Sequence, residues 1–303
     1  MRRIVRTWHM DSTRWDSYRP RAGDIVIATY PKCGTTWTQR IVSALVFQSA
    51  EPRPMAVSPW IDERFLGSLE EITARLEAQT HRRFLKSHLP FDALPVYHDV
   101  SYIHVARDGL DAMMSWHNHQ RQYKRMELLD KVGLADETIA RTYPRPAEAP
   151  HEFFQDWIGA NGPANESDVS AASFFDTERS YWAARDKPNV LMVHYADMLT
   201  DLDGEMRRIA DFLKIVTPPS LWPDLVRAAT FEQMRRDGEA LMPFAKHAWA
   251  GGHESFIYSG TNERWRGALT EADIANYRER AAKEMSPALN RWLAVGSRGT
   301  TCA

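Results

Sequence analysis

The stretch of residues 24–37, DIVIATYPKCGTTW, constrains the fold of this chain more than any other. Residues 25–28 form an unbroken apolar run, which is typical of a parallel strand buried on both faces, and a proline soon ends it. Gly34 allows a sharp turn, and Thr35 or Thr36 is placed to cap the helix that the following apolar pattern predicts. The sequence therefore predicts a strand, a tight loop and a helix N-terminus in immediate succession.

A loop of this kind is suited to binding an anion. The backbone N–H groups in the first turn of a helix have no partners within the helix, and their dipoles favour negative charge. Lys32 adds a full positive charge that can neutralise a leaving oxygen. The pattern is not the nucleotide-binding G-x-x-x-x-G-K-[ST], because the lysine precedes the single glycine. An ordinary strand-to-helix turn is the alternative reading, and Lys32 favours a phosphate or sulfate site over it.

Composition narrows the class of protein. The chain has 303 residues, of which 44% are hydrophobic, and we expect one large α/β domain rather than two small ones. With 38 basic and 40 acidic residues, the chain has no net positive charge that would attract nucleic acid or an anionic membrane. Neither is therefore expected as a partner. No stretch approaches the roughly 18 apolar residues of a membrane span, and the N-terminus lacks the apolar core of a signal peptide.

The metal-binding residue types are sparse. Cys33 and Cys302 are the two cysteines of the sequence, too few for a disulfide framework or a zinc cluster, and they fit a reducing cytoplasm. His117 and His119 are two residues apart on a predicted helix and face different sides of it. We therefore expect a cytoplasmic protein without a bound metal.

The rest of the chain repeats the alternation of strand and helix. Further strands are predicted at residues 83–86, 101–106 and 190–194. Helical patterns occupy residues 68–78, 110–119 and the stretch after Tyr195. This order predicts a parallel sheet with helices on both faces. Two stretches break the rhythm: residues 121–150 are expected to form a long loop, and the glycine-rich residues 236–267 are expected to fold over a ligand.

Two polar pairs follow the predicted strands. Lys86 is the last residue of the second predicted strand and His88 follows it, at the end where open parallel sheets place their sites. A histidine there can act as a general base, because its pKa lies near neutrality; a histidine that caps a surface turn is the alternative reading. Arg107 follows the third strand and Ser115 lies two turns into the next helix, so both can hold one phosphate if Arg107 folds back.

These blocks together resemble the soluble sulfotransferases, which take the sulfuryl group from 3′-phosphoadenosine 5′-phosphosulfate (PAPS). The similar segments are residues 29–37 for the family's 5′-phosphosulfate loop, 86–90 (KSHLP) for its Lys-Thr-His-Leu-Pro segment, 107–115 for its 3′-phosphate motif and 256–270 for its C-terminal glycine loop. They follow the family's order from about residue 20 to 285, within a single sulfotransferase domain expected to span residues 1–303. The resemblance implies an α/β fold with a P-loop-like phosphosulfate-binding loop, PAPS as donor, 3′,5′-diphosphoadenosine (PAP) as product and no metal.

The resemblance also implies roles for individual residues. His88 would be the catalytic base, Lys32 would neutralise the bridging phosphate oxygen and Lys86 would contact the sulfuryl group. The residues implied to hold the donor are Lys32, Cys33, Gly34, Thr35, Thr36, Trp37, Arg107, Ser115, Tyr195, Thr230, Phe231, Met234, Ser259 and Gly260. The acceptor is expected to be a hydroxyl of a small, largely apolar alcohol or phenol. The aromatic residues expected around it are Trp60, Phe65, Phe91, Tyr123, Phe153, Trp157 and Trp249.

One departure from the family pattern concerns charge. Tyr258 and Ser259 stand where animal cytosolic members have an arginine and a lysine that grip the 3′-phosphate. Part of that charge is therefore missing or is supplied from elsewhere. The basic residues in the same region that could supply it are Arg236, Lys246 and Arg264.

A second departure concerns assembly, and two other functions stay open. Glu271 and Ala275 replace a valine and a glutamate of the family's dimer motif, so the sequence predicts no oligomeric state. A nucleotide-dependent phosphotransferase (kinase) would need magnesium and carboxylates to hold it, and the missing nucleotide-binding motif counts against it. A catalytically silent nucleotide-binding protein is the other alternative, and Lys32 together with His88 counts against that.

Overall fold

The centre of the molecule is a four-stranded parallel sheet. A computed structural model describes the chain except for residues 1, 8, 65–66, 125–145, 160–172 and 299–303. Its strands are β1 (Ile25–Ala28), β2 (Phe84–Ser87), β3 (Ser101–Ala106) and β4 (Val190–His194), in the order β2-β1-β3-β4. All neighbouring strands run parallel, so their carboxyl ends meet at one edge. The predicted fold, a single α/β domain with a central parallel sheet, is confirmed.

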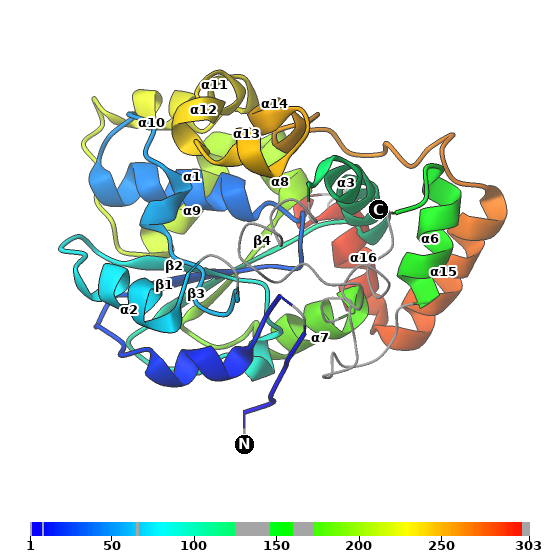
Figure 1. Ribbon diagram of the computed structural model, residues 1–303, viewed down its shortest axis with the longest axis horizontal. Coiled ribbons are helices and arrows are strands. Elements are labelled where there is room, and N and C mark those ends of the chain that lie inside the picture. Colours follow the sequence, from blue (N-terminus) through cyan, green and yellow to red (C-terminus); the bar gives the residue numbers. More distant parts are fainter. Residues whose placement is uncertain (1, 8, 65–66, 125–145, 160–172, 299–303) are drawn as a thin grey trace.

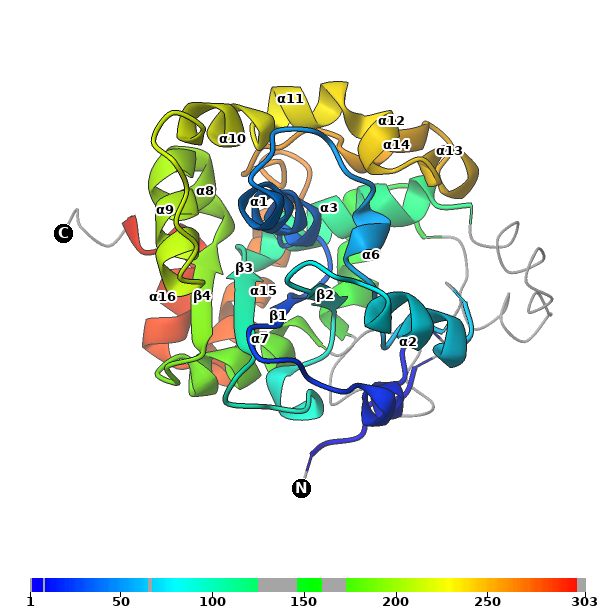
Figure 2. The ribbon, with the colours of Figure 1, turned by 90° about the vertical axis from the view of Figure 1, so that its left-hand side faces the viewer.

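Helices cover both faces of the sheet (Figure 1). One face packs against α1 (Thr35–Phe47), α8 (Tyr195–Thr200) and α9 (Leu202–Phe212). The other face packs against α2 (Leu69–Glu77) and α7 (Phe174–Ala184). Figure 2 shows the strands side by side, with α9 next to β4 and α2 beyond β2.

The apolar run of β1 follows from this layering. Ile25 and Ile27 belong to the apolar cluster on the α1 side, whereas Val26 and Ala28 belong to the cluster on the α2 side, and all four are fully buried. A central strand covered on both faces needs apolar side chains at every position instead of every second one. The unbroken run is thereby explained.

The remaining helices surround the carboxyl edge of the sheet. One apolar cluster is built by α3 (Gly109–Gln122), α6 (Pro150–Gly159), α15 (Glu271–Glu284) and α16 (Pro287–Val295), together with α7. Five short helices lie beyond α1 in Figure 1: α10 (Trp222–Ala228), α11 (Phe231–Arg236), α12 (Gly238–Leu241), α13 (Ala245–Ala248) and α14 (Gly252–Phe256). A fourth cluster, the short-helix cluster, joins Met234 of α11 to Trp249 after α13.

Some predicted boundaries were wrong. The helix after Ala106 runs to Gln122, three residues beyond the predicted end. The single helix predicted after β4 is in fact two helices, α8 and α9. The Asp201 side chain accepts a hydrogen bond from Gly204 N and so caps the start of α9. Residues 236–267, which break the predicted alternation of strand and helix, include three short helices. The greater part of the long loop predicted at 121–150 lies outside the described residues.

The cap predicted for α1 was also wrong. Gly34 is the N-cap, and neither Thr35 nor Thr36 caps the helix through its side chain. The backbone of Gly34 has a φ of 121°, and a Cβ there would lie 3.1 Å from the ring of Tyr195. Only glycine fits this turn, so the threonines fall inside the first helical turn, where the Thr35 hydroxyl bonds that of Thr29 at 2.5 Å.

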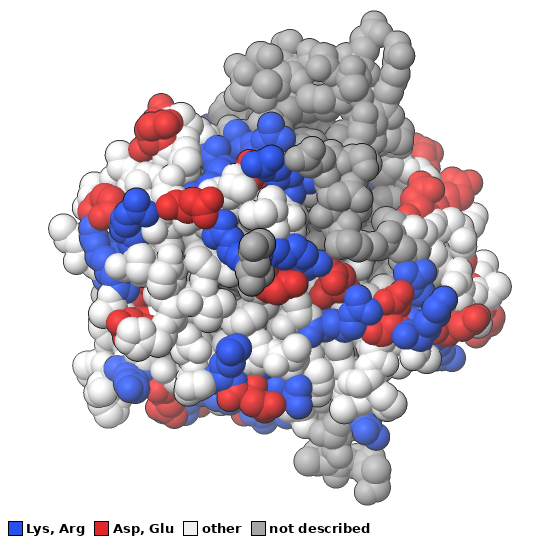
Figure 3. Space-filling model, turned by 90° about the horizontal axis from the view of Figure 1, so that it is seen from below, with Lys and Arg blue, Asp and Glu red and all other residues white. Residues whose placement is uncertain are grey.

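The surface carries charges of both signs. On the face in Figure 3, basic and acidic side chains are interspersed, in line with the nearly balanced composition. Among the described residues, no helix combines the length and the apolar character that crossing a membrane requires.

Candidate active site

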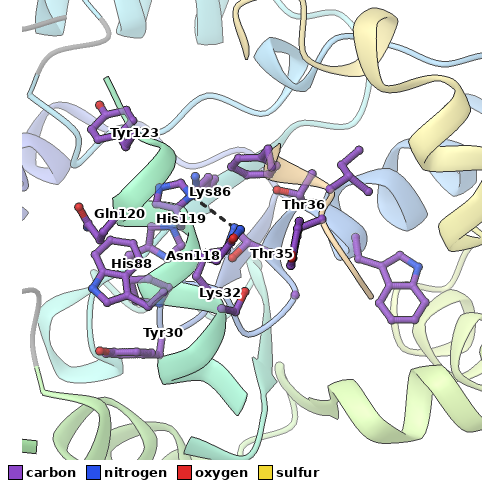
Figure 4. A pocket seen from close by; sticks show the side chains of 18 of the residues that line it. Tyr30, Lys32, Thr35, Thr36, Lys86, His88, Asn118, His119, Gln120 and Tyr123 are labelled. Atoms are coloured by element: carbon purple, nitrogen blue, oxygen red, sulfur yellow. Dashed lines mark hydrogen bonds between the residues drawn. The ribbon is translucent and has the colours of Figure 1, made fainter. Parts of the chain in front are cut away.

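A pocket of about 840 Å³ opens at the carboxyl edge of the sheet. The loop after β1, the ends of β2 and β3, one side of α3 and the short helices all contribute to its wall (Figure 4). Of the predicted donor and catalytic residues, it is lined by Lys32, Gly34, Thr35, Thr36, Trp37, Lys86, His88, Arg107, Ser115, Tyr195, Phe231, Met234, Ser259 and Gly260. Of the predicted acceptor residues, it is lined by Trp60, Tyr123, Phe153, Trp157 and Trp249.

Two predicted donor residues do not line the pocket. The side chain of Cys33 is fully buried in the cluster below α3, and burial raises the pKa of its thiol well above the usual value. Thr230 is the N-cap of α11, where its hydroxyl accepts a hydrogen bond from Gln233 N at 3.3 Å. The side chains of both residues therefore have structural roles, Cys33 in an apolar cluster and Thr230 as a helix cap.

The placement of Phe91 corrects one acceptor prediction. Phe91 belongs to the core on the α2 side of the sheet, where its ring lies 5.5 Å from that of Tyr181 and 5.8 Å from that of Tyr102. The chain turns away from the pocket after His88, and Phe91 begins a short 3₁₀ helix that packs against α7. Phe65, another acceptor prediction, lies outside the described residues.

Lys32 projects from the loop into a group of rings and cations. Its Nζ lies 3.5 Å from Nδ1 of His119 and 4.1 Å from the centroid of the Phe256 ring (Figure 4). Burial lowers the pKa of Lys32 to about 7, and the positive charges of Lys86 and Arg107 add to the shift. The loss of water around the ammonium group and the nearby positive charges both disfavour the protonated form of Lys32.

His88 is buried, with 8% of its surface exposed. Its Nδ1 lies 2.8 Å from the carbonyl oxygen of Thr29. Because a carbonyl only accepts hydrogen bonds, Nδ1 carries the proton in the neutral ring and Nε2 keeps its lone pair. Burial holds the pKa of His88 well below its usual value, and the charge of Lys86 adds to this. His88 is therefore a neutral imidazole whose Nε2 can accept a proton.

Lys86 is the second lysine near His88. Its Nζ lies 4.0 Å from the centroid of the Trp60 ring. Burial lowers the pKa of Lys86 to about 8, while the carboxylates of Asp62 and Glu63 oppose the shift. Lys86 is therefore held as a cation at neutral pH against the cost of its own desolvation.

Arg107 lies at the other end of the pocket and has folded back over the loop. Its Nη2 donates to the Thr261 carbonyl at 2.8 Å and to the Asn262 side chain at 2.9 Å, and its Nη1 donates to the Lys32 carbonyl at 3.3 Å. The guanidinium also lies 4.1 Å from the Tyr195 ring centroid. These contacts connect the first loop to the C-terminal loop through a single cation.

Arg264 is the one of the three suggested compensating cations that lines the pocket. Its guanidinium lies over the ring of Tyr258, 4.7 Å from the centroid. Burial lowers the pKa of Arg264, and the charge of Arg107, which lines the same pocket, acts in the same direction. Arg236, in contrast, donates to the neighbouring Gln233 side chain at 3.3 Å.

His119 was not predicted as a site residue. Its ring stacks on Trp116 at 5.2 Å and on Tyr123 at 5.8 Å, and it contacts Lys32, which is 87 residues away in the sequence. A signal was present, since His119 stands four residues after Ser115 and therefore lies on the same face of α3. Among the described residues, no three His, Cys, Asp or Glu side chains are grouped closely enough to hold a metal ion.

Comparisons with known proteins show the family of this chain. The family model described as a sulfotransferase domain matches residues 22–287. The glycolipid sulfotransferase of Mycobacterium tuberculosis is 35% identical, over 98% of this chain and 95% of its own length. The luciferin sulfotransferase of Photinus pyralis is 25% identical, over 89% of this chain and 74% of its own.

Solved structures show the same fold. Mouse sulfotransferase SULT7A1 complexed with PAP has a TM-score of 0.70 and 20% identity, and the match covers 92% of this chain and 90% of the other. Retinol dehydratase in complex with androsterone and PAP has a TM-score of 0.69 and 22% identity, covering 91% and 84%. The extent of the family match and of the mycobacterial relative is decisive: this chain belongs to the sulfotransferase family.

Proposed function

We propose that this protein transfers the sulfuryl group of PAPS to a hydroxyl of a small, largely apolar alcohol or phenol. The observation that carries the proposal is the convergence of Lys32, Lys86, Arg107 and Arg264 on one pocket. Burial lowers the pKa of Lys32, Lys86 and Arg264, and mutual repulsion adds to the shifts of Lys32 and Arg264. An anionic ligand that reaches both ends of the pocket relieves this excess of positive charge.

The residues present fit such a donor. The N-terminus of α1 and Lys32 would hold the 5′ end, whereas Arg107, Ser115 and Arg264 would hold a 3′-phosphate. Tyr195, Phe231 and Met234 would pack on the adenine. A close approach is built in at Gly260, where a Cβ would lie 2.4 Å from the Phe231 ring.

When bound, PAPS supplies a sulfuryl group on a good leaving group. His88 accepts the acceptor's hydroxyl proton at Nε2 as the new oxygen–sulfur bond forms. Lys32 neutralises the charge left on the departing phosphate oxygen, and Lys86 stabilises the sulfuryl oxygens. The products are a sulfate ester and PAP, and the proton stays on His88 until solvent removes it.

The acceptor class rests on the pocket wall. Trp60, Tyr123, Phe153, Trp157 and Trp249 form a largely aromatic surface, which suits an apolar body beside the reacting hydroxyl. Glycolipids join the simple alcohols as candidates, because the 35% identical relative is named a glycolipid sulfotransferase. A cytoplasmic location also belongs to this proposal, and the free, buried thiol of Cys33 suits a reducing compartment.

Labelled PAPS tests the proposal. We expect the purified protein to transfer label to at least one member of a panel of phenols, steroids, aliphatic alcohols and glycolipids, with His88→Ala protein as the control. Activity should persist in EDTA, because sulfuryl transfer by these residues needs no metal. Label transfer from ATP that EDTA abolishes would support a kinase instead. PAP binding without turnover of any acceptor would support a silent binding protein.

A further inference from the structure

Trp60 touches two of the residues assigned to catalysis. Its ring lies 4.0 Å from Nζ of Lys86, and its centroid lies 4.9 Å from that of His88 at an interplanar angle of 87°. A cation over an aromatic face and an edge-to-face ring pair are both attractive and depend on orientation. Trp60 thus faces the reacting groups of the pocket from the side of β2.

The orientation of Trp60 is fixed from behind by a buried carboxylate. Asp62 is fully buried, and its Oδ2 accepts a hydrogen bond from Nε1 of Trp60 at 2.7 Å. Its other oxygen accepts one from Nε1 of Trp15 at 2.9 Å. A carboxylate shared by two indole N–H groups restricts the rotation of both rings.

The backbone holds the same segment against the strand that carries Lys86. Lys86 N donates to the Pro59 carbonyl at 2.9 Å, and Trp60 pairs with Lys86 in a parallel bridge. Trp60 and Lys86 are therefore neighbours through both backbone and side chain. The backbone pairing sets their spacing, and the bond to Asp62 sets the angle of the ring.

We propose that Trp60, oriented by Asp62, is a positioning residue that holds Lys86 and His88 for the reaction, in addition to being part of the acceptor wall. The inference rests on the proposed function. A charged Lys86 is stabilised by the ring face of Trp60, while Asp62 and Glu63 also favour the charge and burial opposes it. The neighbouring titratable groups His9 and Lys32 also act on His88.

The test separates positioning from acceptor binding. We expect Trp60→Leu to lower kcat by about 10²-fold, the scale of a small misplacement of catalytic groups, while the Kd of PAP stays within about threefold. Trp60→Phe keeps a ring face but loses the bond to Asp62, so it should recover part of kcat, and Asp62→Asn should show a similar intermediate loss. Trp182→Leu is the matched control, because Trp182 also has a cation over its ring, Arg185 at 4.7 Å, and does not line the pocket. It should leave kcat and the acceptor KM unchanged.

A second readout does not depend on turnover. In protein with ¹³C-methylated lysines and no ligand, the NMR titration of Lys86 should move to lower pH in Trp60→Leu but not in Trp182→Leu. A Trp60→Leu protein with unchanged kcat, a raised acceptor KM and an unmoved Lys86 titration would overturn the inference and leave Trp60 as acceptor wall alone. Failure of the proposed function is distinct, since the wild-type protein would then form no sulfated product.

Discussion

Arg264 offers a sharp test of how the donor is recognised. The loop has Tyr258 and Ser259 where relatives in animals have two cations, and Arg264 stacks on Tyr258 and lines the same pocket as Arg107. We expect Arg264 to replace the missing charge at the 3′-phosphate. Arg264→Ala should therefore weaken PAP much more than adenosine 5′-monophosphate, which lacks that phosphate.

The magnitude follows from the type of contact. A hydrogen bond to a charged group contributes roughly 1.5 to 3 kcal/mol, which corresponds to about a 10- to 150-fold change in Kd. Arg264 is only half-buried, so water screens it and the lower end of that range applies. We therefore expect the Kd of PAP to rise about 10- to 30-fold, with the Kd of the monophosphate almost unchanged.

Calorimetry at two salt concentrations measures both quantities. Loss of one cation should make PAP binding less sensitive to salt. Arg236→Ala is the matched control, because Arg236 lies in the same region and hydrogen-bonds to Gln233. Introducing Tyr258→Arg with Ser259→Lys should tighten PAP binding in the Arg264→Ala protein and change little in the wild type. Equal weakening of PAP and the monophosphate, or none, would refute the assignment of Arg264 to the 3′-phosphate.

Four further outcomes are expected. His88→Ala should lower kcat by roughly 10² to 10⁴ while PAP binds normally, because His88 acts on the acceptor; near-normal turnover at saturating donor would remove it from the mechanism. PAP at one hundred times its Kd should add about 2.7 kcal/mol to the free energy of unfolding, so an unchanged melting temperature in millimolar PAP would contradict the donor site. Lys32 has its pKa lowered to about 7 and binds an anion only when protonated, so PAP affinity should fall as the pH rises from 7 to 9, and Lys32→Arg should flatten that profile. The same shift means that, in the unliganded protein, the contribution of Lys32 to folding stability should rise over pH 7 to 10, where the unfolded chain binds more protons.

The sequence was informative where structure is local. The apolar run at 25–28, the turn at Gly34 and the positions of Lys86 and His88 at the end of a strand were readable because each depends on neighbours in the chain. The capping prediction failed for a local reason that a pattern does not show: the backbone at Gly34 already has the left-handed φ of 121°. The threonines that follow it therefore begin the helix itself.

What could not be read depends on distant segments. Phe91 is an aromatic residue of the kind that lines apolar pockets. The turn after His88 instead carries it into the core on the α2 side of the sheet. The contact between Lys32 and His119 joins residues 87 positions apart, and the choice of Arg264 over its basic neighbours depends on how the last loop packs. Tertiary packing decides these contacts, and no periodic pattern in a single sequence reveals which distant segments pack together.

The short-helix cluster joins the two halves of the pocket energetically. Met234 and Phe231 are assigned to the nucleotide, whereas Trp249 and Tyr123 are assigned to the acceptor, yet all four pack into this one cluster. Two ligands that contact a common wall affect each other's binding, and this effect is reciprocal. PAP changes the affinity for the acceptor by the same factor by which the acceptor changes the affinity for PAP. We therefore expect a substitution in this wall to change the Kd of both ligands, and an acceptor profile measured at low donor concentration to differ from one measured at saturation.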